Sequence, residues 1–467
     1  MRLLQILFLG LAIFSFDFVS HAQWQLQQLC MFSNNPAQGT PSFIIQGSNG
    51  NFYGMLSSTA VSGPLPNNVV IVGRFFEMTP SGSVTIFPAT PSSSILGLNP
   101  ELAPADDGGF YATTYTNATF PFPSLGSILK LTPSGQISTA FTFHPLNGGR
   151  PSSIRRGLDG FFYGLTTGTN TGAFSTAYKT IFQFSTNNTL TTLFSVTNAT
   201  ELTGAPVQGP DGYLYGTTAL ENFGHPASGS TYLVSFYRLS TNGDFSTLYT
   251  RSNFPAKATE LIFGSDGSLY GAIGGRSATG LTPATPGSIF RITTAGVFSN
   301  LFTFNFTNGF DPVDRLVLAA DGSLYGTTSG MPINGLNGAI FHISANGVLT
   351  TLMTFHGSSE IAPSSPLIQA TDGNLYGTGA IVPTTISGMA FRLVPATAVS
   401  TLSVSNGVAA ITWNSFTNGA YRVEYKSSLS DSNWAPLGPP ITATDSTTTT
   451  LDNSPDSQRI YRVVLLP

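Results

Sequence analysis

The chain has 467 residues, a formal net charge of −4 at pH 7 and only 9% charged residues. Its 50 Gly and 31 Pro favour a turn-rich β protein, while 41% hydrophobic residues supply a core that a disordered chain lacks. The sequence has no basic run to neutralise phosphates, so nucleic acid is excluded as an expected partner.

The first segment has the pattern of a secretory signal. Met1 and Arg2 precede the apolar stretch 3–16, and a small-residue cleavage pattern ends at Ala22. We expect residues 1–22 to be a signal peptide, so that the mature protein is secreted or lies at the cell surface or in the periplasm. An uncleaved anchor is the alternative, but the stretch is short for a bilayer span and Asp17 interrupts it. We expect no membrane span after cleavage.

Cys30 is the sole cysteine, so no internal disulfide can form. The sequence favours a thiol that packs as a small apolar side chain.

A hexapeptide with the pattern Asp-Gly-x-Leu-Tyr-Gly organises most of the chain. It occurs seven times, and its tyrosines are Tyr53, Tyr111, Tyr163, Tyr215, Tyr270, Tyr325 and Tyr376. Asp-Gly readily takes the positive φ angles of a tight hairpin, so each copy predicts a turn between two strands. Seven copies at a period of 51–58 residues are typical of β-propeller blades.

Each repeat can be divided into four short strands, as in the third and fourth strands expected at 287–292 and 298–304. Six fourth strands follow a third strand, whereas the seventh repeat stops after 391–393. Residues 26–32 resemble an orphan fourth strand placed before the first repeat. We therefore expect residues 23–395 to form a seven-bladed β-propeller closed by the N-terminal strand. A linear solenoid is the alternative, but it does not explain one missing strand and one extra strand.

The period is lost in residues 400–467. Apolar and charged residues alternate in 421–426, as in a half-buried antiparallel strand, and Trp413 and Trp434 are expected in its core. This segment resembles a small fibronectin type III-like β-sandwich. The predicted fold class is therefore all-β.

Three motifs carry a resemblance to a known family. They are Asp-Gly-x-Leu-Tyr-Gly-Thr-Thr, Gly-x-Ile-Phe-x-Ile and Leu-Thr-Thr-Leu-x-x-Phe, found best at 211–218 and 321–328, whereas Asn49 and Ala112 depart from the pattern. Residues 24–395 resemble the Gloeo/Verruco (GloVer) tandem repeat of "choice-of-anchor" bacterial surface proteins. The resemblance implies an exported bacterial protein and supplies no catalytic residues. The sequence ends at Pro467 without the apolar tail and basic cluster expected of such anchors.

The recurring polar residues do not form a predicted catalytic or metal site. The hairpin Asp residues are explained by hydrogen bonds to their own backbone, although calcium binding is the alternative. The tyrosines are expected to pack between blades, with a sugar-binding platform as the alternative. The histidines show no metal-ligand spacing, and we find no catalytic Ser in a Gly-x-Ser-x-Gly elbow. We predict no catalytic residue, metal or cofactor.

The scarce charges gather in the loops that lead from a fourth strand to the next inner strand. They are Glu101, Arg150, Arg155, Arg156, Glu201, Lys257, Glu260, Asp311, Asp314, Arg315 and Glu360. In a propeller these loops meet at one mouth of the central channel, where they can hold a polar ligand such as a glycan or a peptide. The other interpretation is that loops simply tolerate charge. The residues that we select as the ligand site are Glu101, Arg155, Glu260 and Arg315.

These observations favour an exported, non-enzymatic binding or adhesion protein of the cell envelope or exterior, monomeric by default. One alternative is a lyase or hydrolase acting on a polysaccharide or a lactone, because streptogramin-type lyases are similar Gly-rich exported propellers. The other is a structural surface-layer component.

Overall fold

The computed structural model describes residues 24–32, 40–61, 69–87, 97–115, 125–168, 178–196, 200–222, 231–276, 284–305, 309–331, 336–344, 347–356, 361–363, 365–381, 388–395, 399–415, 420–428, 431, 433–444, 447–453 and 459–465. The expected signal peptide, residues 1–22, lies outside this set. Among the described residues, no helix is long and apolar enough to cross a membrane.

The fold is all-β and propeller-like, and the short 3-10 turn η1 (Pro145–Asn147) is the one helical element in the described part of the chain. Two compact units are distinguished, one formed by Gln28–Gln369 with Tyr376–Arg392 and one that includes Leu393–Pro467.

Six four-stranded antiparallel sheets follow one another along the described chain. The first sheet contains β2 (Thr40–Gln46), β3 (Phe52–Val61), β4 (Val69–Met78) and β5 (Val84–Ile86), and the second contains β6 (Gly97–Pro104), β7 (Phe110–Tyr115), β8 (Ser127–Leu131) and β9 (Ile137–Thr142). The third contains β10 (Pro151–Arg156), β11 (Phe162–Thr166), β12 (Lys179–Phe184) and β13 (Leu190–Val196), and the fourth contains β14 (Glu201–Gln208), β15 (Leu214–Asn222), β16 (Thr231–Leu239) and β17 (Phe245–Phe254). The fifth contains β18 (Ile262–Phe263), β19 (Leu269–Ile273), β20 (Ser288–Ile292) and β21 (Phe298–Thr303), and the sixth contains β22 (Asp311–Leu318), β23 (Leu324–Met331), β24 (Leu336–Ile343) and β25 (Leu349–His356). The predicted four-strand division of each repeat thus holds for these six sheets.

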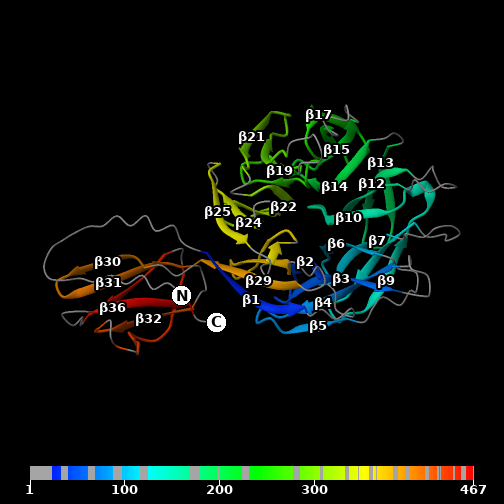
Figure 1. Ribbon diagram of the computed structural model, residues 1–467. Helices are drawn as coiled ribbons and strands as arrows, with labels where there is room; N and C mark the ends of the chain where they lie inside the picture. Colours follow the sequence, from blue (N-terminus) through cyan, green and yellow to red (C-terminus); the bar gives the residue numbers. More distant parts are fainter. Residues whose placement is uncertain are drawn as a thin grey trace. The chain divides into compact units, whose positions relative to one another are not determined.

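The seventh sheet combines the two ends of the repeat region. Its order is β1 (Trp24–Phe32), β29 (Gly388–Pro395), β28 (Leu375–Ile381) and β26 (Ile361–Pro363), and β27 (Ile368–Gln369) also pairs with β28. The N-terminal strand β1 is therefore the outer strand beside β29, which the sequence leaves without a following partner. Figure 1 shows the first strands of several sheets, such as β6, β10 and β22, near a common centre, with β5, β9, β17 and β21 at the periphery.

Each hairpin carboxylate stabilises its own turn. Asp Oδ1 accepts a hydrogen bond from the backbone N–H two residues later at 2.9–3.2 Å in the turns of Asp107, Asp159, Asp211, Asp266 and Asp321. The following glycine has a positive φ, for example +85° at Gly160, which a side chain would strain. This bonding supports the turn interpretation of the repeated Asp.

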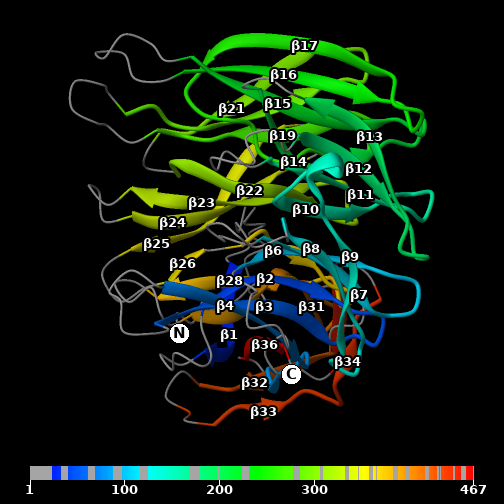
Figure 2. The ribbon, with the colours of Figure 1, turned by 90° about the vertical axis from the view of Figure 1, so that its right-hand side faces the viewer.

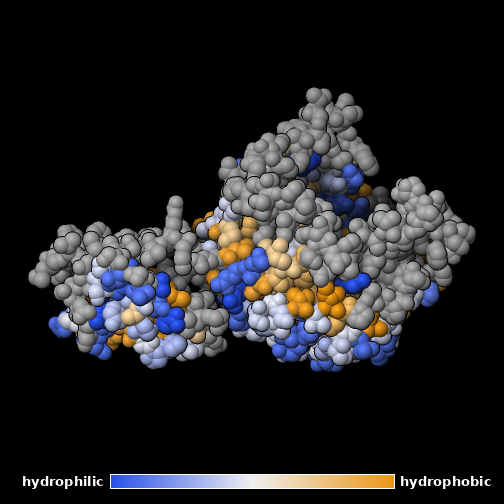
Figure 3. All heavy atoms as spheres, turned by 60° about the horizontal axis from the view of Figure 1, so that its bottom comes forward, coloured by the Kyte–Doolittle hydropathy of each residue, from blue (hydrophilic) through white to orange (hydrophobic). Residues whose placement is uncertain are grey.

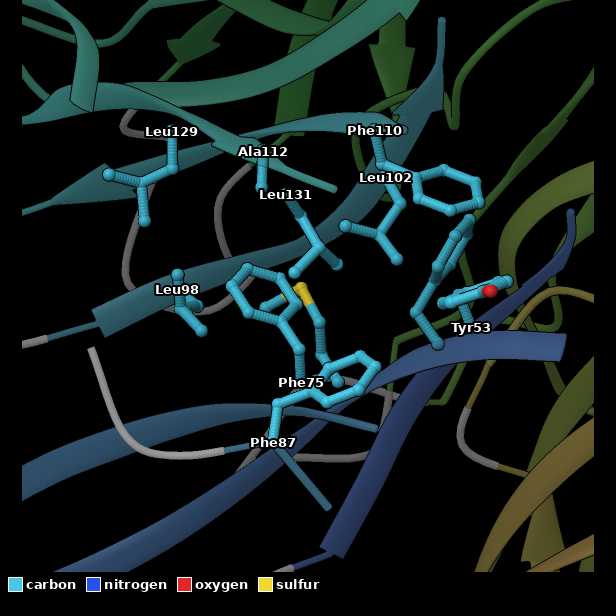
Figure 4. Packing of buried hydrophobic residues seen from close by; sticks show 11 residues of the cluster. Tyr53, Phe75, Phe87, Leu98, Leu102, Phe110, Ala112, Leu129 and Leu131 are labelled. Atoms are coloured by element: carbon cyan, nitrogen blue, oxygen red, sulfur yellow. The ribbon is translucent and has the colours of Figure 1, made fainter. Parts of the chain in front are cut away.

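The repeat tyrosines pack between consecutive sheets, as predicted. Tyr53 is 1% exposed, and its ring centroid lies 4.7 Å from that of Phe110 in the next sheet. Tyr111 stands at the same distance from Phe162. Figure 4 shows Tyr53 and Phe110 within a cluster of hydrophobic side chains shared by the first and second sheets. The apolar core of the repeat region therefore lies between sheets.

The tyrosine hydroxyl also reaches the hairpin. Tyr163 donates to Asp159 Oδ2 at 2.6 Å, and Tyr215 donates to Asp211 Oδ2 at the same distance. Burial and the adjacent carboxylate raise the pKa of both tyrosines, so both hydroxyls stay protonated donors at neutral pH. The Asp-Gly turn and the buried tyrosine thus form one hydrogen-bonded unit.

The glycine that follows each tyrosine leaves room for an aromatic ring on the neighbouring strand. Gly326 is paired with Phe341, and a Cβ placed on Gly326 would lie 2.4 Å from Phe341 Cζ. The second sheet departs from the repeat, because Ala112 stands in this position and faces the smaller Leu129. The departure of Ala112 from the sequence motif is therefore compensated across the strand pair.

One face of the repeat region, on the side where β4 and β5 lie in Figure 1, carries a band of hydrophobic residues bordered by hydrophilic ones (Figure 3). Apolar atoms are ordinary on a folded surface, so the band carries no functional argument.

The unit that includes Leu393–Pro467 contains two small sheets. One is β30 (Val399–Ser405), β31 (Val408–Asn414) and β35 (Thr447–Asp452); the other is β32 (Ala420–Lys426), β33 (Ala435–Pro436), β34 (Ile441–Thr442) and β36 (Ile460–Leu465). Trp413 and Tyr421 lie fully buried in their shared core.

Two expectations for this unit were wrong. Trp434 is half-buried outside the core, with Lys426 Nζ 5.0 Å and Arg462 Cζ 4.4 Å from its ring, because a loop aromatic can be covered by cationic side chains. The charged face of β32 is less exposed than expected: the side chain of Glu424 is 7% exposed and pairs with Arg422 and Arg462 at 2.7 and 2.6 Å, whereas that of Arg422 is 42% exposed.

We expect Gly326→Ala to lower the free energy of unfolding by about 1–3 kcal/mol, because the added methyl overlaps the Phe341 ring. The double variant Gly326→Ala/Phe341→Leu, which copies Ala112 and Leu129, should lose less stability than the sum of the two single changes. Urea denaturation measures all three, and additive losses would contradict this account of the glycine.

Candidate functional site

The predicted site residues occupy related places in the repeat. Glu101, Glu260 and Arg315 each stand ten residues before a repeat tyrosine, and Arg155 stands eight residues before Tyr163. Three of them lie on inner strands, Glu101 on β6, Arg155 on β10 and Arg315 on β22, while Glu260 closely precedes β18. Two perpendicular views show β6, β10 and β22 close together (Figures 1 and 2).

The structure brings all four side chains into one network, which we name the central charge cluster. Arg315 Nη1 lies 2.6 Å from Glu101 Oε1 and 4.0 Å from Glu260 Oε2. Arg155 Nη2 pairs with the same oxygen of Glu260, and Arg155 Nη1 donates to the Leu261 carbonyl at 3.0 Å. Acidic and basic groups therefore alternate in the order Glu101, Arg315, Glu260, Arg155, and their formal charges balance.

The two close ion pairs join sheets that are not neighbours in sequence. Glu101 belongs to the second sheet and Arg315 to the sixth, while Arg155 belongs to the third and Glu260 stands at the start of the fifth. Residues as much as 214 positions apart are thus in hydrogen-bond contact. The cluster lies where the inner edges of four sheets approach one another.

The fourth sheet supplies the seat for Glu260. The backbone N–H of Ala205 donates to Glu260 Oε1 at 3.1 Å. Gly204 has φ +68°, and a Cβ on it would lie 2.2 Å from Glu260 Cγ. Because glycine has no side chain, Gly204 leaves the space that the Glu260 side chain occupies, and it acts on the position of Glu260 in this indirect way.

Burial dominates the electrostatics of the cluster. Desolvation and the charge of Glu260 raise the pKa of Glu101 to about 7, while Arg315 and Arg155 act in the opposite direction. The four side chains keep 11–20% of their surface exposed. The cluster can therefore offer carboxylate and guanidinium edges to a polar molecule, and one of its acids titrates near neutral pH.

The described residues contain no metal-binding group of His, Cys, Asp or Glu side chains. No set of three or more His, Cys, Asp or Glu side chains is close enough there to hold a metal ion. His342 packs against Tyr325 with ring centroids 4.9 Å apart, and burial lowers its pKa. His144 is exposed at η1. His225 and the side chain of His356 lie outside the description.

Other charged residues from the same loops form separate contacts. Arg156 pairs with Asp106 at 2.6 Å, Lys257 pairs with Glu201, and Asp311 accepts a hydrogen bond from Gly275 N at 2.7 Å. They do not join the central charge cluster. Glu360 and the side chain of Asp314 lie outside the described residues.

Sequence reasoning missed one contributor to the site, Gly204, and one buried residue at the repeat position of Glu101, Ser153. Ser153, the residue ten before Tyr163, is 5% exposed, and its hydroxyl has no partner within the described structure. Aligning the repeats on their tyrosines would have found it, because it shares the position of Glu101. The sequence gives no indication of the role of Gly204, because that role depends on the side chain of Glu260 from another sheet.

The raised pKa of Glu101 predicts a pH-dependent stability. Its native pKa of about 7 lies above its ordinary 4.5, so the native state binds the proton more tightly than the unfolded chain does. The stability that this group contributes is fully present below pH 4.5 and is lost as the pH rises through about 7. We expect the free energy of unfolding of the wild type to fall relative to that of Glu101→Gln over this interval. Parallel urea curves at several pH values measure it, and a constant difference would contradict the assignment.

No curated protein matches the chain. Similar solved structures include a luciferin-regenerating enzyme, 14% identical with 65% of this chain and 92% of that chain covered and a TM-score of 0.40. Regucalcin, a calcium-binding protein from Agrobacterium tumefaciens, is 12% identical with 64% and 90% covered and a TM-score of 0.39. The extracellular domains 1-2 of Drosophila Semaphorin 1a are 11% identical with 76% and 86% covered and a TM-score of 0.41.

At these TM-scores and identities the structural likenesses carry no functional argument. The sequence match is specific, because it covers the fourth to seventh copies of the Asp-Gly-x-Leu-Tyr-Gly hexapeptide. Residues 203–422 match the Gloeobacter/Verrucomicrobia repeat, so this part of the chain carries the repeat of that family.

Proposed function

We propose that this protein is an exported, non-enzymatic binding protein whose repeat region is a seven-bladed β-propeller closed by β1. The observation that carries the proposal is the central charge cluster, which gathers two acids and two bases from four sheets. The expected signal peptide supports export. The two small sheets of the C-terminal unit suit a fibronectin type III-like spacer.

Contacts between the seventh and first sheets support ring closure. A proline that begins an inner strand packs against the glycine before a third strand: a Cβ on Gly287 would lie 2.2 Å from Pro312 Cδ. The same contact joins the last and first sheets, where a Cβ on Gly388 would lie 2.5 Å from Pro41 Cδ. Phe52 also packs on Tyr376 with ring centroids 4.3 Å apart. The seventh sheet thus meets the first as other consecutive sheets meet.

The chemistry of the cluster supports binding over catalysis. Both guanidinium groups are paired with carboxylates, which favours a role in holding a ligand over a role in activating one. Carboxylate and guanidinium edges recognise hydroxyl and amide groups by directed hydrogen bonds. A polar ligand such as a glycan or a peptide therefore suits the site, in the monomer that we take as the default state.

The cluster should be required for binding. We expect the purified protein to bind a subset of a glycan array or a peptide array, and Glu260→Ala and Arg315→Ala to abolish that binding, because each leaves an opposite charge uncompensated. Lys130→Ala, which removes an ion pair with Asp107 outside the cluster, is the matched control and should bind as the wild type does. Circular dichroism checks that the variants fold. Retained binding in both cluster variants would contradict the assignment of the site. Absence of binding to either array would contradict the proposed function.

A further inference from the structure

A second site is formed at a junction where the inner strand ends without a side chain that bridges consecutive sheets. The residue seven before each repeat tyrosine ends the inner strand of its sheet. In the second to seventh sheets this position holds Pro104, Arg156, Gln208, Phe263, Leu318 and Gln369.

Four of these side chains reach the preceding turn. Arg156 pairs with Asp106 at 2.6 Å, and Phe263 packs on Tyr215 with ring centroids 5.5 Å apart. Gln369 Oε1 accepts a hydrogen bond from Ala320 N at 2.7 Å. Gln208 forms hydrogen bonds with the turn of Asp159. The bridging position therefore fastens successive hairpins to one another.

Gln208 shows what the turn binds. Its Oε1 accepts from the backbone N–H of Leu158 at 2.7 Å and from that of Asp159 at 3.2 Å, and its Nε2 donates to Asp159 Oδ2 at 2.9 Å. One primary carboxamide thus satisfies two neighbouring amide donors and the turn carboxylate. The two N–H groups of an Asp-Gly turn form a seat for a carbonyl-type oxygen.

At the turn of the fifth sheet this seat is open. The corresponding position of the sixth sheet holds Leu318, whose side chain has no hydrogen-bonding atom and is 37% exposed. Among the described residues, the backbone N–H groups of Ser265 and Asp266 donate to no protein acceptor, although they correspond to those of Leu158 and Asp159.

A groove of about 310 Å³ lies at this junction between the fifth and sixth sheets. Ser265 and Asp266 form part of its wall, and Leu301, Leu324 and Ile343 supply an apolar surface. Gly264 and Gly322 also line it, so a ligand can approach the backbone closely. The groove combines a polar seat with apolar walls, as small-ligand sites do.

The local charge favours a neutral oxygen. Asp266 Oδ2 is bound by Arg291 through Nε at 2.9 Å and Nη2 at 2.7 Å, so the two charges compensate each other. No excess positive charge is left to attract an anion, and the Asp266 carboxylate stands beside the seat. A carboxylate would meet like charge there, whereas a carboxamide would not.

We propose that the groove between the fifth and sixth sheets binds a primary carboxamide, such as the glutamine side chain of a peptide, with its oxygen on the N–H groups of Ser265 and Asp266. The methylene groups of the same side chain pack on the apolar wall. The site is separate from the central charge cluster and does not depend on the function proposed for it.

The replacement Leu318→Gln supplies the missing carboxamide from within the chain. The probe is N-acetyl-glutamine N-methylamide, titrated into the full chain by calorimetry or ligand-observed NMR. We expect it to bind the wild type, and Leu318→Gln to weaken binding at least about tenfold, because the new side chain occupies the seat as Gln208 does. Leu318→Met, which is similar in size and lacks an amide, should bind within about twofold of the wild type.

Two further measurements keep the test independent of the folding of one variant. Gln208→Leu should open a further seat at Leu158 and Asp159 and raise the stoichiometry by one site. The glutamate analogue of the probe should bind at least about tenfold more weakly than the glutamine probe at pH 7. Absence of glutamine-probe binding to the wild type, equal binding of the glutamate analogue, or unchanged binding in Leu318→Gln would each overturn the proposal.

Discussion

The repeat region depends on one constraint: each sheet has two apolar faces, and both must be covered by neighbouring sheets. Phe43 and Tyr53 of the first sheet share a core with Leu102 and Phe110 of the second, and similar clusters join later sheets. A linear series would leave the outer faces of its first and last sheets in water, at about 25 cal/mol for each Å² of apolar surface. The contacts of Phe52 with Tyr376 and of Pro41 with Gly388 cover those faces in the proposed ring. Hairpin turns, glycine gaps and tyrosine rings all serve this packing of sheet on sheet.

The proposed ring also accounts for the meeting of charges from distant repeats. Inner strands around a common axis face strands that are not their sequence neighbours, so Glu101 meets Arg315 and Arg155 meets Glu260. Removing these charges from water is unfavourable, and their mutual pairing offsets that cost. The partial exposure of the four side chains leaves hydrogen-bonding edges available, which is why we assign the cluster to binding and the buried Asp–Tyr contacts to the fold.

Much of this organisation could be predicted from the sequence, because the repeat reveals equivalent positions. The tyrosine period located the hairpins, the strand count anticipated that β1 lies beside β29, and scarce charge at related positions selected all four cluster residues. The pairing within the cluster could not be predicted, since it depends on how the sheets are placed around the axis. Alternation likewise could not show that cationic side chains cover Trp434 outside the core. The seat at Ser265 and Asp266 could be identified only after Gln208 had shown what the corresponding turn binds.

Removal of β1 tests the closed ring most directly. Deleting residues 24–32 exposes the edge of β29, so we expect a lower melting temperature or oligomers formed through that edge, measured by calorimetry and by light scattering. A synthetic peptide of residues 24–32 should restore the monomer and raise the melting temperature by refilling the position beside β29. A monomer with an unchanged melting curve after the deletion would contradict the closure of the ring by its N-terminal strand.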